Sequence, residues 1–416
     1  MAVPAIVANI TTPLLSMVDL AIVGHLGSAV FVAAIAVGGT IFNMLYWLFG
    51  FLRFGTSGLT AQAYGANNFD ELHLVGVRSL MIAMLFGAVM ILLQNPLGDL
   101  ALNIMQPDAD TRAIAELYFH ILIFGAPAVL MQYSLTGWFV GRQNTRVPML
   151  VALLVNVINI GASLLLVYVF DLGIRGVAFG TLIAQWIGCV VAMIIAKMRL
   201  PSWQNVIDRA ALRKFFSINF DIFLRTLCLI AVTLWFTRSG ASQGAVILAV
   251  NTLLMQMFTL FSYFMDGFAF AGEALCGKYY GAKDFVGLRR CVANLMLSGL
   301  IVAAVFTLLY AFGIESIIAL LTDDKAIQMV AQRFNYWAVA VPLAGFLAFT
   351  ADGVAIGLTH TRLMLKSMVA SMIVFFIVCY TCSPGMGNHA LWLAFVIYLL
   401  SRGVILTAML RGPIKG

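Results

Sequence analysis

Charge is scarce in this 416-residue chain, because Asp, Glu, Lys and Arg make up only 10% of it while hydrophobic residues make up 62%. Soluble globular domains carry about a quarter charged residues, so the composition excludes one. The chain also lacks the spacings of a phosphate-binding loop, of a zinc protease and of a catalytic Ser, His and Asp set. These absences argue against ATP as an energy source and against an enzyme. What the chain has instead is long apolar runs, and its mean hydropathy is +1.01.

Cysteine is sparse too, and its placement excludes a disulfide framework. Nearly all of the six cysteines lie inside apolar runs, where a thiol packs as a small apolar group. Cys379 and Cys382 match the CxxC spacing, but without a second pair or a nearby His we interpret the match as a coincidence. The sequence therefore predicts no metal and no cofactor.

Apolar runs near the 20 residues that cross the ~30 Å hydrocarbon core as a helix recur along the chain. Because each segment in lipid must satisfy its own backbone hydrogen bonds, and because the alternation of a β-barrel is lacking, we predict an all-α integral membrane protein. Its twelve predicted transmembrane helices lie near residues 2–24, 29–62, 73–95, 112–140, 147–170, 174–198, 214–237, 244–276, 286–313, 326–358, 362–382 and 387–410. No cleavable signal peptide is apparent, and the first residues already resemble helix interior, so we expect the natural chain to begin further upstream.

The second half of the chain repeats the first. YGANNFDEL at residues 64–72 returns as YGAKDFVGL at 280–288, 216 positions later. At the same offset, GxxxG pairs that let helices approach closely recur at Gly137 and Gly141 and at Gly353 and Gly357. Repetition on this scale is typical of transporters built from two related bundles.

Six helices fall in each half, so both halves begin and end on the same side of the membrane. The repeats are therefore parallel, related by pseudo-two-fold symmetry along the membrane normal. We predict an N-lobe of helices 1 to 6 at residues 1–198, a cytoplasmic lobe linker at 199–213 and a C-lobe of helices 7 to 12 at 214–416.

Lys and Arg are concentrated on one alternating set of loops, while the opposite set is rich in Asp. Because basic residues favour cytoplasmic loops, we expect both termini to be cytoplasmic, in a multi-pass protein of a bacterial inner (plasma) membrane. The net charge of +7 is interpreted as topology and attraction to anionic membrane lipid rather than nucleic-acid binding. We expect the protein to act as a monomer.

Asp19 is the intramembrane acid with the strongest functional case, because such acids are costly in lipid. Polar residues on its own helix lie on one face, at Asn9, Thr12, Ser16 and Asp19, and a second polar face follows at Asn156, Asn159 and Ser163, with Thr181 and Gln185 on the next helix. Apolar walls disfavour the charged carboxylate while hydroxyls and amides stabilise it, so the pattern predicts a proton-exchanging acid. Pro13 predicts a bend in the same helix.

The C-lobe carries more acids, which are substrate or gating candidates. Asp221 and Arg225, four residues apart, are expected to form a neutralising pair rather than a coupling site. Asp266 and Glu273 share a helix face and have an open role, and Asp352 lies on the tenth helix. At the 216-residue offset Glu273 corresponds to Ser57 and Asp352 to Thr136, so the frame is duplicated but the charge is not.

The chain resembles the multidrug and toxic compound extrusion (MATE) family, and most closely its DNA-damage-inducible F (DinF) branch. The segments that carry the resemblance are NITTPLLSMVDLAIVGHLG at 9–27, GLTAQAYGA at 58–66, NTRVPM at 144–149, NFDIFLR at 219–225, DGFAFAGEA at 266–274 and GNHALWLA at 387–394. The resemblance implies two six-helix lobes arranged as a V, which export cationic amphiphiles in exchange for H+ or Na+.

The resemblance also implies an ion-coupling site. It maps the family's acid to Asp19 and its amide and hydroxyl partners to Asn159 and Thr181, with Tyr118 and Thr136 as further members. Many relatives have a second Asp where this chain has Ser163. Because a hard-cation site prefers several oxygens including carboxylate, this departure favours protons over sodium.

We therefore predict a secondary active multidrug efflux antiporter, exporting organic, mostly cationic amphiphilic compounds in exchange for H+. Sodium coupling is one alternative. A second is a lipid-linked oligosaccharide flippase of the same superfamily, which needs a basic cavity for pyrophosphate that only Arg53, Arg225, Arg333 and Arg402 can supply. An intramembrane enzyme or receptor is a third, disfavoured by the repeat.

Overall fold

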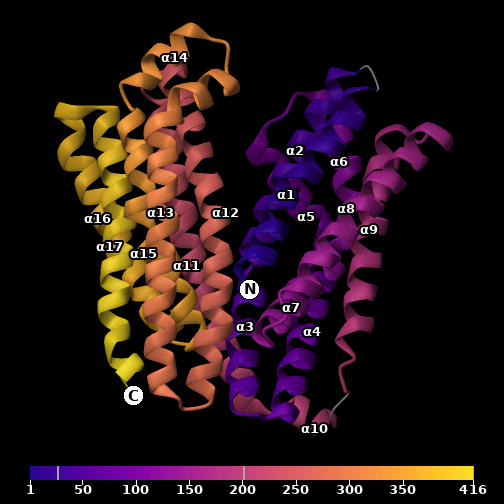
Figure 1. The fold of residues 1–416 in the computed structure, drawn as a ribbon. Helices are drawn as coiled ribbons and strands as arrows, with labels where there is room; N and C mark the ends of the chain where they lie inside the picture. The colour runs from indigo at the N-terminus through magenta and orange to yellow at the C-terminus, as the bar shows by residue number, and fades with distance from the viewer. Residues whose placement is uncertain (26–27, 200–201, 416) are drawn as a thin grey trace. The chain divides into compact units, whose positions relative to one another are not determined.

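A computed structural model describes residues 1–25, 28–199 and 202–415, with the backbone alone for residues 12–17. Within these ranges every regular element is helical (Figure 1). The chain divides into two compact units, which we call unit 1 (residues 3–215) and unit 2 (residues 216–416). The predicted lobe boundaries stay a prediction.

The helices of unit 1 pack against sequence neighbours and against more distant helices alike. They are α1 (Ala2–Gly24), α2 (Ala29–Leu48), α3 (Phe51–Gly65), α4 (Phe69–Leu92), α5 (Gln94–Met105), α6 (Ala109–Leu122), the 3-10 turn η1 (Ile123–Gly125), α7 (Ala126–Gly141), α8 (Arg146–Leu164), the π turn η2 (Leu165–Val169), α9 (Gly173–Ala196) and α10 (Trp203–Val206).

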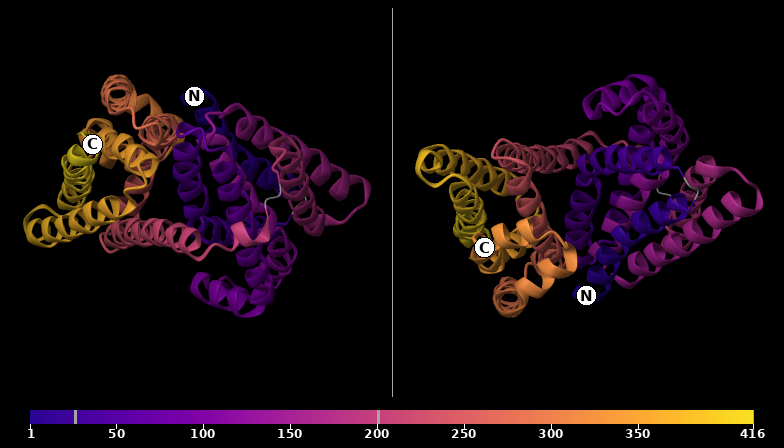
Figure 2. Two further views of the ribbon diagram at one scale, coloured as in Figure 1. Left: turned by 90° about the horizontal axis from the view of Figure 1, so that it is seen from below. Right: turned by 90° about the horizontal axis from the view of Figure 1, so that it is seen from above.

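Unit 2 begins inside α11, a continuous helix whose first residues belong to unit 1. Its elements are α11 (Arg209–Ala241), α12 (Ala245–Gly281), α13 (Phe285–Leu321), α14 (Lys325–Gln332), α15 (Asn335–Gly357), α16 (Thr361–Met386) and α17 (Asn388–Lys415). Views turned by 90° show the helices of each unit packed around one another as a bundle (Figure 2).

The prediction of an all-helical membrane protein is confirmed. Among the described residues, eleven helical segments are long and apolar enough to cross a membrane, and α1, with 23 residues, has the same length class. Some expected spans are interrupted helices. Residues 29–62 divide into α2 and α3, and residues 112–140 into α6 and α7 with η1 between them.

Two short helices near loop ends depart from the predicted pattern. The expected span 326–358 is wrong at its start, because α14 is a separate helix that Asp324 caps by accepting hydrogen bonds from the backbone N–H groups of Ala326 and Ile327. α14 lies at one end of unit 2 (Figure 1). α5 was not expected as an element at all, since Pro96 and Asp99 obscure its short apolar pattern.

Proline has different roles in the two units. Pro127 does not bend a helix interior, because it occupies the first turn of α7 directly after η1, where its missing N–H has no intrahelical partner to lose. Pro342 is inside α15. Pro13 lies among residues whose side chains are outside the described part of the chain, so the predicted bend stays a prediction.

The internal repeat extends to backbone conformation. Asn67 and Lys283, 216 positions apart, both adopt a left-handed conformation, with φ of 54° and 58°. The residue after each one caps the next helix, because the side chain of Asn68 accepts from the N–H of Glu71 and Asp284 accepts from Gly287. The turn between α3 and α4 and the turn between α12 and α13 therefore have the same conformation with different residues.

The repeated glycines hold helices in close contact, which confirms their interpretation as packing residues. A Cβ on Gly137 would lie 2.2 Å from the carbonyl oxygen of Arg53, and one on Gly353 would lie 2.4 Å from that of Ala269. The positions 53 and 269 are again 216 apart. A side chain at either glycine would clash severely with the backbone of the neighbouring helix. The packing of α7 on α3 and of α15 on α12 therefore requires glycine at these positions.

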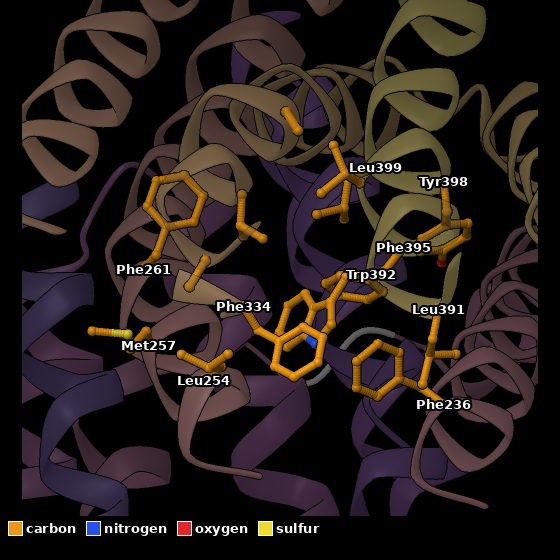
Figure 3. Close-up of a cluster of buried hydrophobic side chains, with 14 of the residues drawn as sticks. Phe236, Leu254, Met257, Phe261, Phe334, Leu391, Trp392, Phe395, Tyr398 and Leu399 are labelled. Atoms are coloured by element: carbon orange, nitrogen blue, oxygen red, sulfur yellow. The ribbon is translucent and has the colours of Figure 1, made fainter. Parts of the chain in front are cut away.

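The core of unit 2 is aromatic. Side chains from α11, α12 and α17 converge on it, together with Phe334 from the segment between α14 and α15 (Figure 3). The indole of Trp392 is fully buried, and its Nε1 donates to Oδ1 of Asn251 at 2.9 Å. Asn251 and Asn388 also exchange side-chain hydrogen bonds. This satisfied polar cluster fixes α12 against α17 inside otherwise apolar surroundings.

The predicted linker contains α10, which is held by Arg78 of α4. The guanidinium of Arg78 is buried and donates to the carbonyl oxygens of Asn205 and Val206 and to the carboxylate of Glu71. These carbonyls lie at the end of α10, where helix acceptors lack internal partners. Positions 200 and 201 of the linker are outside the described residues, and residues from Arg209 onward are helical.

Candidate functional site

Unit 1 contains a buried polar cluster that joins three helices. Thr181 Oγ1 on α9 lies 3.3 Å from Asp19 Oδ2 on α1, and the Asn159 amide on α8 donates to the same Thr181 oxygen at 2.8 Å. Asp19 is 5% exposed and Asn159 is fully buried. Three residues of the predicted ion-coupling site therefore form one hydrogen-bonded chain.

Close packing of α8 on α9 builds this cluster. A Cβ on Gly180 would lie 2.3 Å from the hydroxyl of Ser163, and one on Gly176 would meet the backbone of Leu166 at 2.9 Å. These glycines let the two helices approach until Ser163 and Asn159, one turn apart on α8, face Thr181. The π turn η2 follows at once, and such turns often mark functional positions in helices.

Three oxygen atoms in the cluster are buried without a hydrogen-bond partner in the described part of the chain. They are Asp19 Oδ1, Asn159 Oδ1 and Ser163 Oγ. Buried polar atoms are nearly always paired in native proteins, so a set of unpaired oxygens indicates a place for a proton, a water molecule or a small cation. The side chains of Thr12 and Ser16, which the sequence placed on the same face as Asp19, are outside the described residues.

The two further members suggested by the resemblance differ in position. Tyr118 on α6 is buried, lies within electrostatic range of Asp19, and packs its ring against Gly38 of α2. Thr136 is half-buried on α7, and no described contact joins it to Asp19. Tyr118 therefore borders the cluster, whereas a role for Thr136 stays a prediction.

Tyr46 is a neighbour that the sequence did not single out as a site residue. Its hydroxyl is buried without a described partner, and its ring lies within electrostatic range of Tyr118 and Tyr133. Tyrosines on α2, α6 and α7 are thus close enough to influence one another electrostatically. Their spacing in sequence carries no periodic signal, because each comes from a different helix.

Unit 2 holds a buried ion-pair triad in place of the expected pair. Asp352 Oδ2 on α15 accepts hydrogen bonds from both Arg225 on α11 and Arg402 on α17. Asp221 instead accepts from the hydroxyl of Thr361 at 2.9 Å. The expectation that Asp221 and Arg225 neutralise each other is therefore wrong, because helices far apart in sequence bring better-placed partners.

The triad carries two positive charges and one negative charge in a buried setting. Asp266 on α12 lies within electrostatic range of Arg402, which offsets part of the excess. Glu273 on the same helix is fully buried, and its backbone carbonyl lies against Gly357. The substrate or gating roles of Asp266, Glu273 and Asp352 stay predictions.

Comparison with known proteins assigns the fold to a family. A family model described as MatE matches residues 4–165 and 218–381. The chain belongs to the MatE family. It is therefore a multi-pass membrane transporter and not an enzyme, and the predicted resemblance is confirmed.

Individual relatives of this MatE protein align with nearly the whole of its chain. It is 38% identical to the DNA damage-inducible protein F of Escherichia coli over 99% of this chain and 91% of that protein. It is 26% identical to the probable multidrug resistance protein NorM of Acinetobacter baylyi, over 97% and 92%. A solved structure of the Vibrio cholerae MATE transporter VcmN in the bent form has the same fold, with a TM-score of 0.88 and 19% identity over 99% of this chain and 95% of that one.

Proposed function

We propose that this MatE transporter exports organic cationic amphiphiles from the bacterial cytoplasm in exchange for protons, with Asp19 as the proton-binding group. The observation that carries the proposal is the buried hydrogen-bonded chain from Asp19 through Thr181 to Asn159. The names of relatives, which include a multidrug resistance protein, support an efflux role.

The Thr181 hydroxyl supports a proton-dependent switch. It has one hydrogen but two acceptors in reach, Asp19 Oδ2 at 3.3 Å and the carbonyl oxygen of Val177 at 3.1 Å. When Asp19 is ionised, the hydroxyl stabilises it by donating to the carboxylate. When Asp19 is protonated, the Thr181 hydroxyl donates its hydrogen bond to the carbonyl oxygen of Val177 in its own helix instead. The link between α1 and α9 therefore weakens on protonation.

Such a change drives transport only if it favours one conformation of the protein over another. Protonation removes a charge-assisted bond between α1 and α9, so it biases any equilibrium in which these helices separate. Substrate release on the outside and proton release on the inside then follow from the same acid being exposed to each side in turn.

Sodium coupling is the second candidate, and one observation favours it. The unpaired oxygens of Asp19, Asn159 and Ser163 are ligand types that hard cations accept. The single carboxylate argues against it, because one negative charge offers a weaker cation site than two. The flippase alternative loses support, since Arg225 and Arg402 both bind Asp352 rather than leaving a basic cavity.

Transport in everted membrane vesicles tests the proposal. Extrusion of a fluorescent organic cation such as ethidium is driven by an imposed pH gradient or, separately, by a sodium gradient. We expect the native protein and Asp99→Asn, which alters an exposed acid, to respond to the pH gradient, and Asp19→Asn to lose that response.

Ser163→Asp is the complementary variant. It adds a second carboxylate to the polar cluster, and we expect it to add a response to the sodium gradient. An Asp19→Asn protein that keeps normal pH-driven extrusion would rule out Asp19 as the proton-binding group. Native extrusion driven by sodium alone would favour the second candidate.

A further inference from the structure

Two thiols of unit 2 face each other across a helical hairpin. Cys276 on α12 and Cys291 on α13 have their Sγ atoms 3.8 Å apart. α12 ends at Gly281 and α13 begins at Phe285, so Cys276 lies about as far before the turn as Cys291 lies after it. In an antiparallel hairpin such residues are at the same level, which explains the contact.

This pair differs from the other cysteines of the chain. All six are free thiols, but no described contact joins Cys189, Cys228 or Cys379 to another sulfur. Cys276 is fully buried while Cys291 is 9% exposed. A small neutral oxidant therefore meets Cys291 first, with a second thiol already in contact behind it.

We propose that Cys276 and Cys291 form a peroxide-sensitive dithiol, a modification site distinct from the polar cluster of unit 1. The Cys291 thiolate attacks hydrogen peroxide, the O–O bond breaks, and the products are a sulfenic acid and hydroxide. The Cys276 thiolate then attacks the sulfenic sulfur, forming the S–S bond and releasing hydroxide. With the two thiol protons counted, two thiols and one peroxide give one disulfide and two water molecules.

The geometry allows this bond with a small movement. A disulfide has its sulfur atoms about 2.05 Å apart, so the two Sγ atoms, now 3.8 Å apart, need to approach by less than about 2 Å. The product joins α12 to α13 next to their turn. The turn itself is held by the Asp284 cap and the left-handed Lys283, so the helices already have the required register.

The repeat provides conservative variants for a test. The positions equivalent to Cys276 and Cys291 in unit 1, 216 residues earlier, hold Thr60 and Val75 on the α3 and α4 hairpin. Because this hairpin has the same turn design, Cys276→Thr and Cys291→Val put into unit 2 residues that the other repeat already carries. Both variants are therefore expected to fold.

Mass spectrometry of the full-length protein in native membranes tests the proposal. Membranes are treated with hydrogen peroxide, free thiols are blocked with N-ethylmaleimide after unfolding, and peptides are compared with and without dithiothreitol. We expect a peptide pair linked through Cys276 and Cys291, reversed by dithiothreitol, while Cys189 and Cys379 remain alkylated as free thiols.

The single variants separate the two roles. In Cys276→Thr, Cys291 is expected to accumulate as a sulfenic acid that dimedone traps, whereas in Cys291→Val, Cys276 is expected to stay reduced. The proposal is overturned if native protein gives no linked pair at peroxide doses that trap Cys291 in the Cys276→Thr variant, or if the two variants oxidise alike. Neither result depends on which ion drives transport.

Discussion

At the scale of single residues, the buried acids of the two units have opposite surroundings. Asp19 accepts a hydrogen bond from the neutral Thr181 hydroxyl, and its other oxygen has no partner among the described residues, which suits the proton exchange that we propose for it. Asp352 is bound by two guanidinium groups, which both donate to its Oδ2. Burial of a carboxylate in a helical bundle therefore does not by itself imply a shared function.

Removing the carboxylate of the triad tests this difference. Asp352→Asn leaves Arg225 and Arg402 as two buried like charges without their counter-charge, and breaking a buried pair costs about 3–5 kcal/mol. We expect a large fall in the unfolding temperature of the purified protein in detergent. Glu315→Gln, at an exposed acid, is the matched control and is expected to have almost no effect. Equal unfolding temperatures would show that the triad adds no stability.

At the scale of elements, the helices were predictable and their contacts only partly so. Long apolar runs predict each span because lipid requires internal backbone hydrogen bonds. The expected span 326–358 covers both α14 and α15, because the charged residues Lys325 and Arg333 do not indicate where the first helix ends. Polar spacing on α1 and α8 nominated Asp19 and Asn159, and hydrogen bonds through Thr181 link these two residues. It could not place Arg402 on Asp352, since residues on separate helices share no periodicity.

Close helix contacts make a prediction for α7 and α3. Gly137→Ala puts a methyl group 2.2 Å from the carbonyl oxygen of Arg53, a backbone atom that cannot rotate away. We expect it to lower the unfolding temperature and the yield of folded protein, with a cost of about 1–3 kcal/mol for overpacking. Gly39→Ala on α2 is the control, because nothing lies within 4 Å of its added Cβ. Similar behaviour of the two variants would mean that α7 can shift without loss.

At the scale of the whole molecule, family, fold and efflux class follow from sequence and comparison together. The repeat predicted two related halves, and the chain divides into two compact units. Its orientation in the membrane rests on the distribution of Lys and Arg alone.

Cysteine labelling checks the orientation. Ala282→Cys and Asp323→Cys alter exposed positions in the turns at opposite ends of α13. We expect a membrane-impermeant maleimide to label Asp323→Cys in intact cells and Ala282→Cys only after permeabilisation, because the basic loops are predicted to be cytoplasmic. Unaltered protein is the control for native cysteines. The reverse labelling pattern would place both termini outside.

The turns after α3 and α12 have the same backbone conformation although their residues differ. Each turn has a left-handed residue followed by a capping side chain, Asn67 with Asn68 and Lys283 with Asp284. Positions that differ between the two turns, such as Glu71 and Gly287, are not needed for the turn conformation. Comparing the two halves of the chain therefore identifies positions that were free to change after duplication. Charged residues could differ between the halves at such positions without changing the fold.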